Sequence, residues 1–461
     1  YMNLQKPSKY LRPSVDDFSV DNHNLNIEVV IDNPEACFRY SGVSITNVEV
    51  KPSPNWLQNR LKTIGLNPIN NVVDITNYVL FETGQPLHAF DANDITGNVI
   101  IVKTLKGGTK FVTLDKTERS LHMEDLMICN SEQPMGIAGV FGGLGSGIKP
   151  STKNIFLESA WFNPVYIRKT SKRHGLNTDA SFRFERGIDP HGVIYALKRA
   201  ALLIKEYAGG SISSDIVDIY PKPAVFFKVQ VSYNNINRLI GKNIEKETIK
   251  KIVGSLEIII ESEDDAGLSL LIPPYRVDVT READVIEEIL RIYGYNNVEI
   301  PTQVKASLQY PEKIDPDNLR NLVANMLSST GFNEIWSNSL TKSAYYENST
   351  VFPFRQTVRL LNPLSSDLNC LRQSLLFGGL ECIAYNINRQ NKDLKLYEFG
   401  NCYDLNSENT QNQLVGNYGE SEHLGLFVTG NKEAENWTGK QEAVSFFYIK
   451  SSAENILKRL G

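Results

Sequence analysis

The chain has 461 residues, of which 41% are hydrophobic and 22% are charged, and its formal net charge is −5. These values are typical of globular proteins, and at roughly 150 residues per domain the length predicts about three domains. No segment approaches the ~20 apolar residues that a membrane helix needs, and the first residues lack the pattern of a secretory leader. We therefore expect a soluble, cytoplasmic protein.

Five cysteines, an odd number, are spread along the chain without a Cys-x-x-Cys pair. This pattern predicts neither a disulfide framework nor a zinc site, and we expect each cysteine to be a small buried residue rather than a nucleophile. The negative net charge does not indicate a nucleic-acid-binding protein, although a local basic patch can still contact phosphates.

The first part of the chain predicts a mixed domain over residues 37–220, preceded by an N-terminal remnant of something longer at 1–36. Alternating apolar residues predict strands within 41–50 and 98–105. Capping signals predict a helix over 164–174.

The middle of the chain predicts a compact α+β domain over residues 225–300, after a linker at 221–226. Successive stretches indicate a strand, two helices, a second strand and a third helix: FKVQVS (227–232), NNINRLIG (234–241), EKETIKKIVGSL (245–256), LSLLIPPY (268–275) and DVTREADVIEEILRIYGY (278–295). Proline and charge at 301–317 mark a second linker. The last domain, 310–461, is expected to begin with a helix within 317–332.

Four stretches of the first domain combine polar residues, glycines and apolar neighbours in a way that indicates a site. They are DITNYVLFETGQPLHAFD (74–91), GIAGVFGGLGSG (136–147), FLESAWF (156–162) and RHGLNTDASFRFERGIDP (173–190). The glycine-rich stretch does not match a nucleotide P-loop, because Ile148 stands where that motif requires lysine. We predict instead a backbone surface without side chains that lies close against a ligand.

These four stretches, in this order, resemble the editing domain of the bacterial phenylalanyl-tRNA synthetase β-subunit family, and the two later domains resemble the same subunit. The resemblance implies an α+β multidomain fold. Its parts are a tRNA editing domain of mixed strands and helices (37–220), a small helix-turn-helix-like α+β domain (225–300), and a class II synthetase-like antiparallel sheet domain (310–461). It also implies a fragment without the family's N-terminal oligonucleotide-binding-like domain and C-terminal anticodon-binding domain.

The resemblance also implies roles for individual residues. Glu158 is expected to recognise the phenolic hydroxyl of a mischarged tyrosine, and His88, with Thr76 and Asn77, to line the site and help place the hydrolytic water. Four further residues are expected to shape the pocket: Gly139, Gly142, Thr178 and Ala180. Ester hydrolysis needs an oriented water and a stabilised oxyanion, and no Ser/His/Asp or Cys/His spacing is evident. The alternative is that His88 and Glu158 are buried polar groups with satisfied hydrogen bonds.

The predicted helix 164–174 begins after a plausible N-cap, Asn163, ends before Gly175, and carries five basic residues: Arg168, Lys169, Lys172, Arg173 and His174. Two readings are open. These residues track the acceptor end of a tRNA, or they complement the negative end of the helix dipole.

On the predicted helix within 278–295, apolar residues form one stripe, and Asp284, Glu287 and Glu288 fall on the other face. Taken alone, such an acidic face is usually just solvated. Together with Asp278, however, the resemblance implies a Mg²⁺ site shared with an α subunit, and carboxylate oxygens suit this cation. An acidic third helix is a poor recognition helix, so no DNA binding is expected.

The last domain has Leu-Tyr-Glu-Phe at 396–399, where a working class II core needs an Arg-x-Glu, and no Gly-x-Gly-x-x-Arg follows. We expect a catalytically inactive scaffold that docks the catalytic α subunit, with Arg372 and Arg389 structural rather than ATP ligands. One hypothesis is the β subunit of an α2β2 heterotetramer that attaches phenylalanine to tRNA(Phe), uses ATP bound elsewhere, and hydrolyses mischarged Tyr-tRNA(Phe). The other is a binding or structural protein that uses the same folds without hydrolysis.

Overall fold

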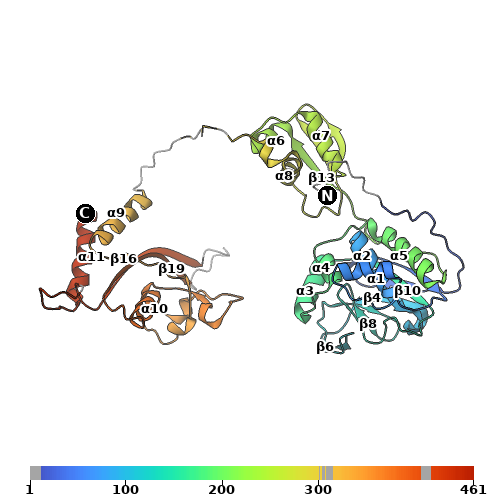
Figure 1. Ribbon diagram of the computed structural model, residues 1–461, viewed down its shortest axis with the longest axis horizontal. Coiled ribbons are helices and arrows are strands. Elements are labelled where there is room, and N and C mark those ends of the chain that lie inside the picture. Colours follow the sequence, from blue (N-terminus) through green and yellow to red (C-terminus); the bar gives the residue numbers. More distant parts are fainter. Residues whose placement is uncertain (1–11, 301, 304–306, 308–314, 406–416, 434) are drawn as a thin grey trace. The chain divides into compact units, whose positions relative to one another are not determined.

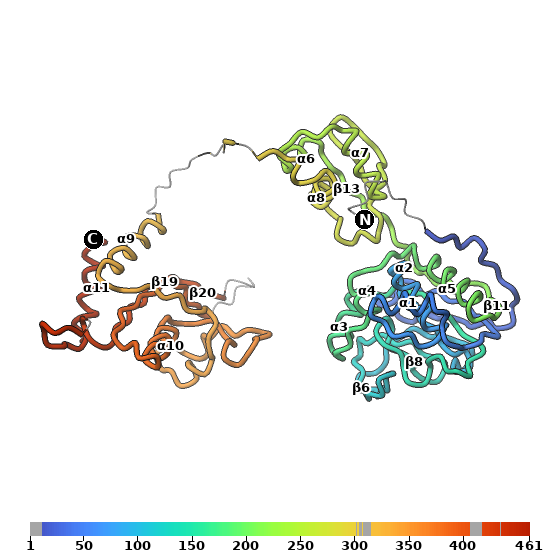
Figure 2. The backbone as a smooth tube through the Cα atoms, viewed as in Figure 1, coloured from blue at the N-terminus to red at the C-terminus, as the bar shows by residue number. Residues whose placement is uncertain are grey.

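The computed structural model describes the chain except for residues 1–11, 301, 304–306, 308–314, 406–416 and 434. The chain forms two compact units, residues 1–302 and 303–461 (Figures 1 and 2). Part of the expected N-terminal remnant and most of the expected linker 301–317 lie outside the described residues.

The first unit contains two five-stranded sheets. One has the order β11-β2-β10-β3, with β12 also paired to β2, and the other has the order β1-β4-β7-β8-β9. The strands are β1 (Glu28–Ile31), β2 (Cys37–Thr46), β3 (Leu87–Asp91), β4 (Val99–Thr104), β7 (Leu126–Cys129), β8 (Pro134–Ile137), β9 (Phe141–Gly142), β10 (Ile155–Phe162), β11 (Ser211–Ile212) and β12 (Val217–Ile219). A separate hairpin joins β5 (Lys110–Val112) to β6 (Glu118–Ser120). Because β1 pairs with β4, residues 28–31 of the expected remnant belong to the folded unit.

Each face of the β11-β2-β10-β3 sheet packs against a different layer. On one face, residues such as Leu157 join a core with helices α2 and α5. On the other face, Phe156 and Phe90 join a core with the second sheet. This division follows from the alternation of side chains along each strand. Figure 1 shows α2 and α5 on the side of β10 opposite to β8. The helices of this part are α1 (Asn55–Thr63), α2 (Asn71–Thr83), α3 (Pro164–His174), α4 (Asp179–Phe184) and α5 (Gly192–Ala208).

Helix ends in this unit follow local capping chemistry. The side chain of Asn163 accepts a hydrogen bond from the amide of Val165, and Gly175 closes α3 in the left-handed conformation, so the predicted helix 164–174 is confirmed. Gly84, with φ of 79°, ends α2 in the same way. That turn lets the chain continue directly into β3.

The middle of the chain forms a three-stranded sheet in the order β13-β15-β14, covered by three helices. Its elements are β13 (Phe227–Ser232), α6 (Tyr233–Ile240), α7 (Lys246–Ser255), β14 (Ile259–Glu263), β15 (Gly267–Ile272) and α8 (Glu282–Tyr293). The predicted strands and helices of this stretch are present. Strand β14, a short segment before a turn, was not predicted from the sequence.

The described part of the second unit contains a three-stranded sheet in the order β16-β19-β20 and three α-helices. Its elements are α9 (Pro316–Ser329), β16 (Asn333–Glu334), β17 (Leu340–Thr341), β18 (Cys370–Leu371), α10 (Leu376–Ile387), β19 (Leu394–Leu405), β20 (Tyr418–Thr429) and α11 (Phe446–Leu460). β19 and β20 pair antiparallel, as expected, but β16 pairs parallel with β19. The sheet is therefore mixed rather than antiparallel, because a long connection through α10 returns the chain in the same direction.

Among the described residues, no helix is both long and apolar enough to cross a membrane. All five cysteines are free: Cys37, Cys129, Cys370 and Cys402 are buried, and Cys382 is half-buried. These positions agree with the expectation of small buried residues.

Candidate functional site

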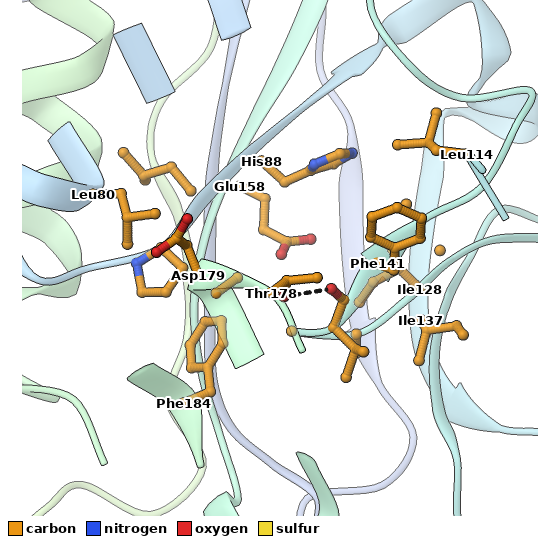
Figure 3. A pocket seen from close by; sticks show the side chains of 18 of the residues that line it. Leu80, His88, Leu114, Ile128, Ile137, Phe141, Glu158, Thr178, Asp179 and Phe184 are labelled. Atoms are coloured by element: carbon orange, nitrogen blue, oxygen red, sulfur yellow. Dashed lines mark hydrogen bonds between the residues drawn. The ribbon is translucent and has the colours of Figure 1, made fainter. Parts of the chain in front are cut away.

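A cavity of about 300 Å³ lies between the two sheets of the first unit and helix α4 (Figure 3). Seven of the eight predicted editing residues line it, although they come from separate parts of the sequence: Asn77, His88, Gly139, Gly142, Glu158, Thr178 and Ala180. The fold therefore brings the four sequence stretches into one place.

Glu158 and His88 reach the cavity from adjacent strands. Glu158 on β10 lies directly opposite His88 on β3 in the strand register, so both side chains leave the same face of the sheet. Figure 3 shows the carboxylate and the imidazole extending into the same space. On its other side Glu158 pairs with Gly42 of β2.

The carboxylate of Glu158 is buried and has one hydrogen-bond partner among the described residues. The hydroxyl of Tyr40 donates to its Oε2 at 2.5 Å. Burial raises the pKa of Glu158 to about 7, although the Tyr40 hydrogen bond acts in the opposite direction. Strand pairing brings this phenol from β2 to Glu158, although the two residues lie far apart in sequence.

His88 is held in its neutral form. Burial lowers its pKa to about 4, and the edge of its ring packs against Phe90 with centroids 4.4 Å apart. Part of the residue faces the cavity, but its Nε2 is buried and has no hydrogen-bond partner among the described residues. Its other ring nitrogen, Nδ1, is not closed off in this way and also has no hydrogen-bond partner among the described residues, so it can bind a water molecule.

Two glycines form part of the cavity wall. Gly139 has φ of 65°, and a Cβ there would lie 2.9 Å from Phe162. A Cβ on Gly142 would lie 2.9 Å from Leu114 and 3.4 Å from the Cε1 atom of His88. A side chain at Gly139 would also strain the backbone, whereas one at Gly142 would require Leu114 to shift.

Helices α2 and α4 supply another part of the wall. Thr178 caps α4, and its hydroxyl donates to the carbonyl oxygen of Val140 at 2.9 Å, which ties the helix to the glycine-containing loop. Ala180 follows on the cavity side. Asn77 lines the cavity from α2, and the described residues provide no hydrogen-bond partner for its side-chain amide.

Thr76 does not line the cavity. Its side chain is buried within α2 packing, and its hydroxyl donates to the carbonyl oxygen of Val73 at 2.7 Å. Successive helical residues point about 100° apart, and of these two Thr76 is the one that points into the packing of α2. The prediction of Thr76 as a site residue is thereby corrected.

The sequence reading missed much of the cavity wall. The missed residues are largely apolar, and they include Leu80, Leu114, Ile128, Ile137, Phe141 and Phe184. Asp179, within the stretch 173–190, also lines the cavity and was not among the predicted site residues. Apolar residues that alternate along strands do not reveal which of them face a hole.

The basic residues of α3 are partly neutralised. Arg173 and His174 both contact the buried carboxylate of Asp125, and Lys169 pairs with Glu124 at 3.1 Å. These contacts support a structural role for the last turn of α3. Arg168 and Lys172 are exposed.

The four acids of the predicted cation site do not converge in this chain. Arg276 contacts both Asp278 and Glu288, and Arg281 pairs with Asp284 at 2.8 Å. Among the described residues, no three His, Cys, Asp or Glu side chains gather as a metal would require. In the chain by itself, three of these carboxylates are therefore paired with arginines and do not surround a common point.

The helix-face prediction for α8 also needs correction. Glu287 is exposed, but Glu288 is buried on the apolar side. Its charge is tolerated there because Arg276 lies 3.1 Å and Arg291 2.7 Å away. The hydrogen bond from Arg291 is the main cause of the lowered pKa of Glu288.

In the second unit, Glu398 is fully buried and does have an arginine beside it. Arg372 lies 2.6 Å from its carboxylate and also donates to the carbonyl oxygen of Asn401. The guanidinium is thus used within the protein, in line with the structural role expected for Arg372. Arg389 stacks on the ring of Tyr385 at 3.4 Å.

Three family models match the chain. They are the B3/4 domain over residues 36–209, the tRNA synthetase B5 domain over 229–295, and the phenylalanyl tRNA synthetase β chain CLM domain over 300–461. The first of these ranges contains the whole cavity.

Several relatives are similar to nearly the whole chain. Phenylalanine–tRNA ligase β subunits from Bacteroides thetaiotaomicron and Porphyromonas gingivalis are 58% and 47% identical over 99% of it, and the one from Carboxydothermus hydrogenoformans is 38% identical over 96%. The chain spans only 56%, 56% and 54% of the length of these relatives. An N-terminal fragment of the synthetase β subunit from Pyrococcus horikoshii is 16% identical, with a TM-score of 0.29 over 60% of this chain and 77% of the fragment, too low to compare the folds.

Proposed function

Because the chain belongs to the phenylalanyl-tRNA synthetase β-subunit family over nearly its whole length, we propose that its cavity hydrolyses the ester bond of mischarged Tyr-tRNA(Phe). The observation that carries this proposal is a buried carboxylate, Glu158, in a cavity that aromatic and aliphatic side chains share with a few polar groups, within the B3/4 match. Such a cavity suits an aromatic side chain that bears one hydroxyl group.

The proposed chemistry needs no protein nucleophile. A water molecule held by the neutral imidazole of His88 and the amide of Asn77 attacks the ester carbonyl carbon, and the ribose oxygen leaves with a proton. Since the pKa of His88 is about 4, its ring is neutral at physiological pH and retains a nitrogen that accepts a hydrogen bond. Orientation of the water supplies the rate enhancement.

The proposed selectivity follows from one oxygen atom. An apolar synthetic pocket rejects an added hydroxyl by only ~10²-fold. A second site that hydrogen-bonds this hydroxyl favours tyrosine over phenylalanine, and a bond to a charged group contributes about 1.5–3 kcal/mol. Glu158 is placed to accept that bond.

The test is a deacylation assay with the purified chain. Tyr-tRNA(Phe) should be hydrolysed well above the uncatalysed rate, and faster than Phe-tRNA(Phe). If neither ester is hydrolysed faster than in buffer alone, the cavity has no editing activity in this chain.

We further propose that the chain acts in the cytoplasm with tRNA(Phe) and a catalytic α subunit, in an α2β2 heterotetramer that attaches phenylalanine with ATP. A Mg²⁺ site shared with that subunit belongs to this proposal. The partner would have to release Asp278 and Glu288 from Arg276, because these carboxylates are paired in the chain alone.

A second candidate function, a scaffold without chemistry, is favoured by the second unit. There Arg372 is buried against Glu398 instead of being available to a nucleotide. Supplied with ATP, phenylalanine and tRNA but no α subunit, the chain should therefore form no phenylalanyl-adenylate. Robust pyrophosphate exchange by the purified chain would contradict the scaffold role of this unit.

A further inference from the structure

Tyr40 places a phenol against the carboxylate that faces the cavity. Its side chain is fully buried, and its hydroxyl donates to Oε2 of Glu158 at 2.5 Å. Tyr40 lies on β2 and pairs with Ala160, two residues beyond Glu158 on β10, so both side chains leave the same face of the sheet. The contact is therefore built by strand register and not by a loop.

This arrangement divides the two oxygens of Glu158 between protein and cavity. Among the described residues, Tyr40 is its hydrogen-bond partner through Oε2, and Oε1 accepts no bond. Glu158 lines the cavity and is 7% exposed. Its second oxygen is therefore available to a molecule in the cavity.

We propose that Tyr40 is a positioning residue for substrate selection, which holds Glu158 through Oε2 so that Oε1 accepts the hydroxyl of a tyrosyl group. This inference rests on the proposed function and deepens it, because it assigns part of the selectivity to a residue that does not touch the substrate.

Two physical effects give Tyr40 this role. A glutamate side chain has several rotatable bonds, and a fixed hydrogen bond removes their freedom before the substrate arrives. A donated hydrogen bond also favours the ionised carboxylate, which is the stronger acceptor. Burial by itself would leave much of Glu158 protonated near neutral pH, since its pKa is about 7 even with the bond to Tyr40.

The other titratable groups near Glu158 do not supply this effect. Burial keeps the imidazole of His88 on β3 neutral by lowering its pKa to about 4. Burial also raises the pKa of the Cys37 thiol at the start of β2. Asp179, on α4, lines the same cavity, but its carboxylate pairs with Arg183 at 3.1 Å. Tyr40 is therefore the group that counteracts the effect of burial on the pKa of Glu158.

The test replaces Tyr40 by phenylalanine, which keeps the ring and removes the hydroxyl. Initial hydrolysis rates of Tyr-tRNA(Phe) and Phe-tRNA(Phe) are compared between about pH 6 and pH 8. In Tyr40→Phe the ratio of the two rates should fall about tenfold at neutral pH. The pH at which this ratio rises should also increase, because without the Tyr40 hydrogen bond the pKa of Glu158 is higher.

A matched control is Tyr233→Phe. Tyr233 is also buried and also donates to a glutamate, Glu263, at 2.8 Å, but it belongs to the β13-β15-β14 domain and does not line the cavity. This variant should keep the wild-type ratio and pH profile.

A double-variant comparison separates positioning from a general structural role. If Tyr40 acts through Glu158, adding Tyr40→Phe to Glu158→Gln should leave the ratio unchanged within about twofold. A double variant that instead lowers the rate ratio by the product of the two single-variant effects would overturn the proposal. So would a Tyr40→Phe variant that loses both activities equally with an unshifted pH profile.

The wild-type chain provides a further test if Tyr40→Phe does not fold. The proposal requires its selectivity for the tyrosyl ester to rise as the pH increases through about 7, and a flat profile would overturn it. Failure of the proposed function is distinct, because wild-type chain would then hydrolyse neither ester. If wild-type chain edits, and folded Tyr40→Phe has the same selectivity as wild type, the role of Tyr40 is disproved but the proposed function stands.

Discussion

Arg372 and Glu398 form an ion pair in the interior of the second unit, with 2.6 Å between Nη1 and Oε1. The arginine is 4% exposed and the glutamate is fully buried. Both charges are largely shielded from water, so the arginine is the main compensation for the glutamate charge, and Ser337 adds two donated hydrogen bonds.

Arg372→Ala should strongly destabilise the second unit. It leaves the charge of Glu398 buried without its partner, and breaking a buried pair costs about 3–5 kcal/mol. Urea unfolding, with hydrogen exchange of β19 amides as the local probe, measures the loss. The exposed Arg389 provides the control: Arg389→Ala should change the free energy of unfolding by less than about 1 kcal/mol. Similar values for both variants would show that the buried pair contributes little.

Ala180→Trp should abolish hydrolysis of Tyr-tRNA(Phe) while the chain still folds. Ala180 lines the cavity, and an indole would fill space needed by the aromatic substrate, whereas overpacking costs only ~1–3 kcal/mol of stability. Deacylation and thermal unfolding are both measured. Phe182→Trp is the control, because Phe182 lies on the same helix but is 54% exposed. Undiminished deacylation by Ala180→Trp would place the active pocket elsewhere.

Glu158→Ala should slow hydrolysis of Tyr-tRNA(Phe) more than that of Phe-tRNA(Phe). The variant loses a charged acceptor whose hydrogen bond contributes about 1.5–3 kcal/mol, so the ratio of the rates should shrink roughly tenfold to a hundredfold. Paired deacylation assays measure it. Equal loss on both substrates would instead make Glu158 a structural or water-positioning group.

The burial of His88 should make stability depend on pH. Its pKa is about 4 in the folded chain and about 6.5 when unfolded, so the unfolded chain binds more protons between these values. The free energy of unfolding therefore falls as pH drops through this window. His88→Asn should lessen the fall by about 2 kcal/mol between about pH 6.5 and pH 4.5.

Urea unfolding at both pH values measures this difference. Glu158 contributes the opposite trend, since its folded pKa is raised to about 7, so each variant is compared with wild type. His23→Asn is the control because its side chain is 60% exposed. Identical pH dependence in His88→Asn and wild type would mean that His88 is protonated as readily in the folded chain as in the unfolded one.

Asp278→Ala with Glu287→Ala should weaken Mg²⁺-dependent binding of the α subunit and leave deacylation unchanged. Both carboxylates lie in the β13-β15-β14 domain and neither lines the cavity. Binding to α is measured by calorimetry with and without Mg²⁺. Glu245→Ala with Asp265→Ala removes two acids from the same domain as a control. If α binds the first variant as it binds wild type in both conditions, the cation assignment fails.

Local features of this chain were predictable because their causes are local. Asn163 and Gly175 mark the start and the end of α3 through capping hydrogen bonds within a few residues. The apolar stripe of α8 follows from helical periodicity, and it is buried through Val285, Ile286 and Ile289. The meeting of four distant stretches at the cavity was expected only from their resemblance to one family's editing domain, and the cavity lining agrees with that expectation.

What only the tertiary structure decided is which distant side chains meet. Tyr40 donates a hydrogen bond to Glu158, which lies 118 positions away in the sequence. Arg276 forms an ion pair with the buried Glu288, which the helical pattern had placed on the solvent-facing side. Thr76 and Asn77 are neighbours in sequence, yet only Asn77 faces the cavity. Periodicity determines that a residue is buried or on a given face. Which residue it contacts there depends on strand register and on how the layers pack. Buried charges and hydroxyl groups form their ion pairs and hydrogen bonds with residues of other helices and strands, which a local sequence pattern does not reveal.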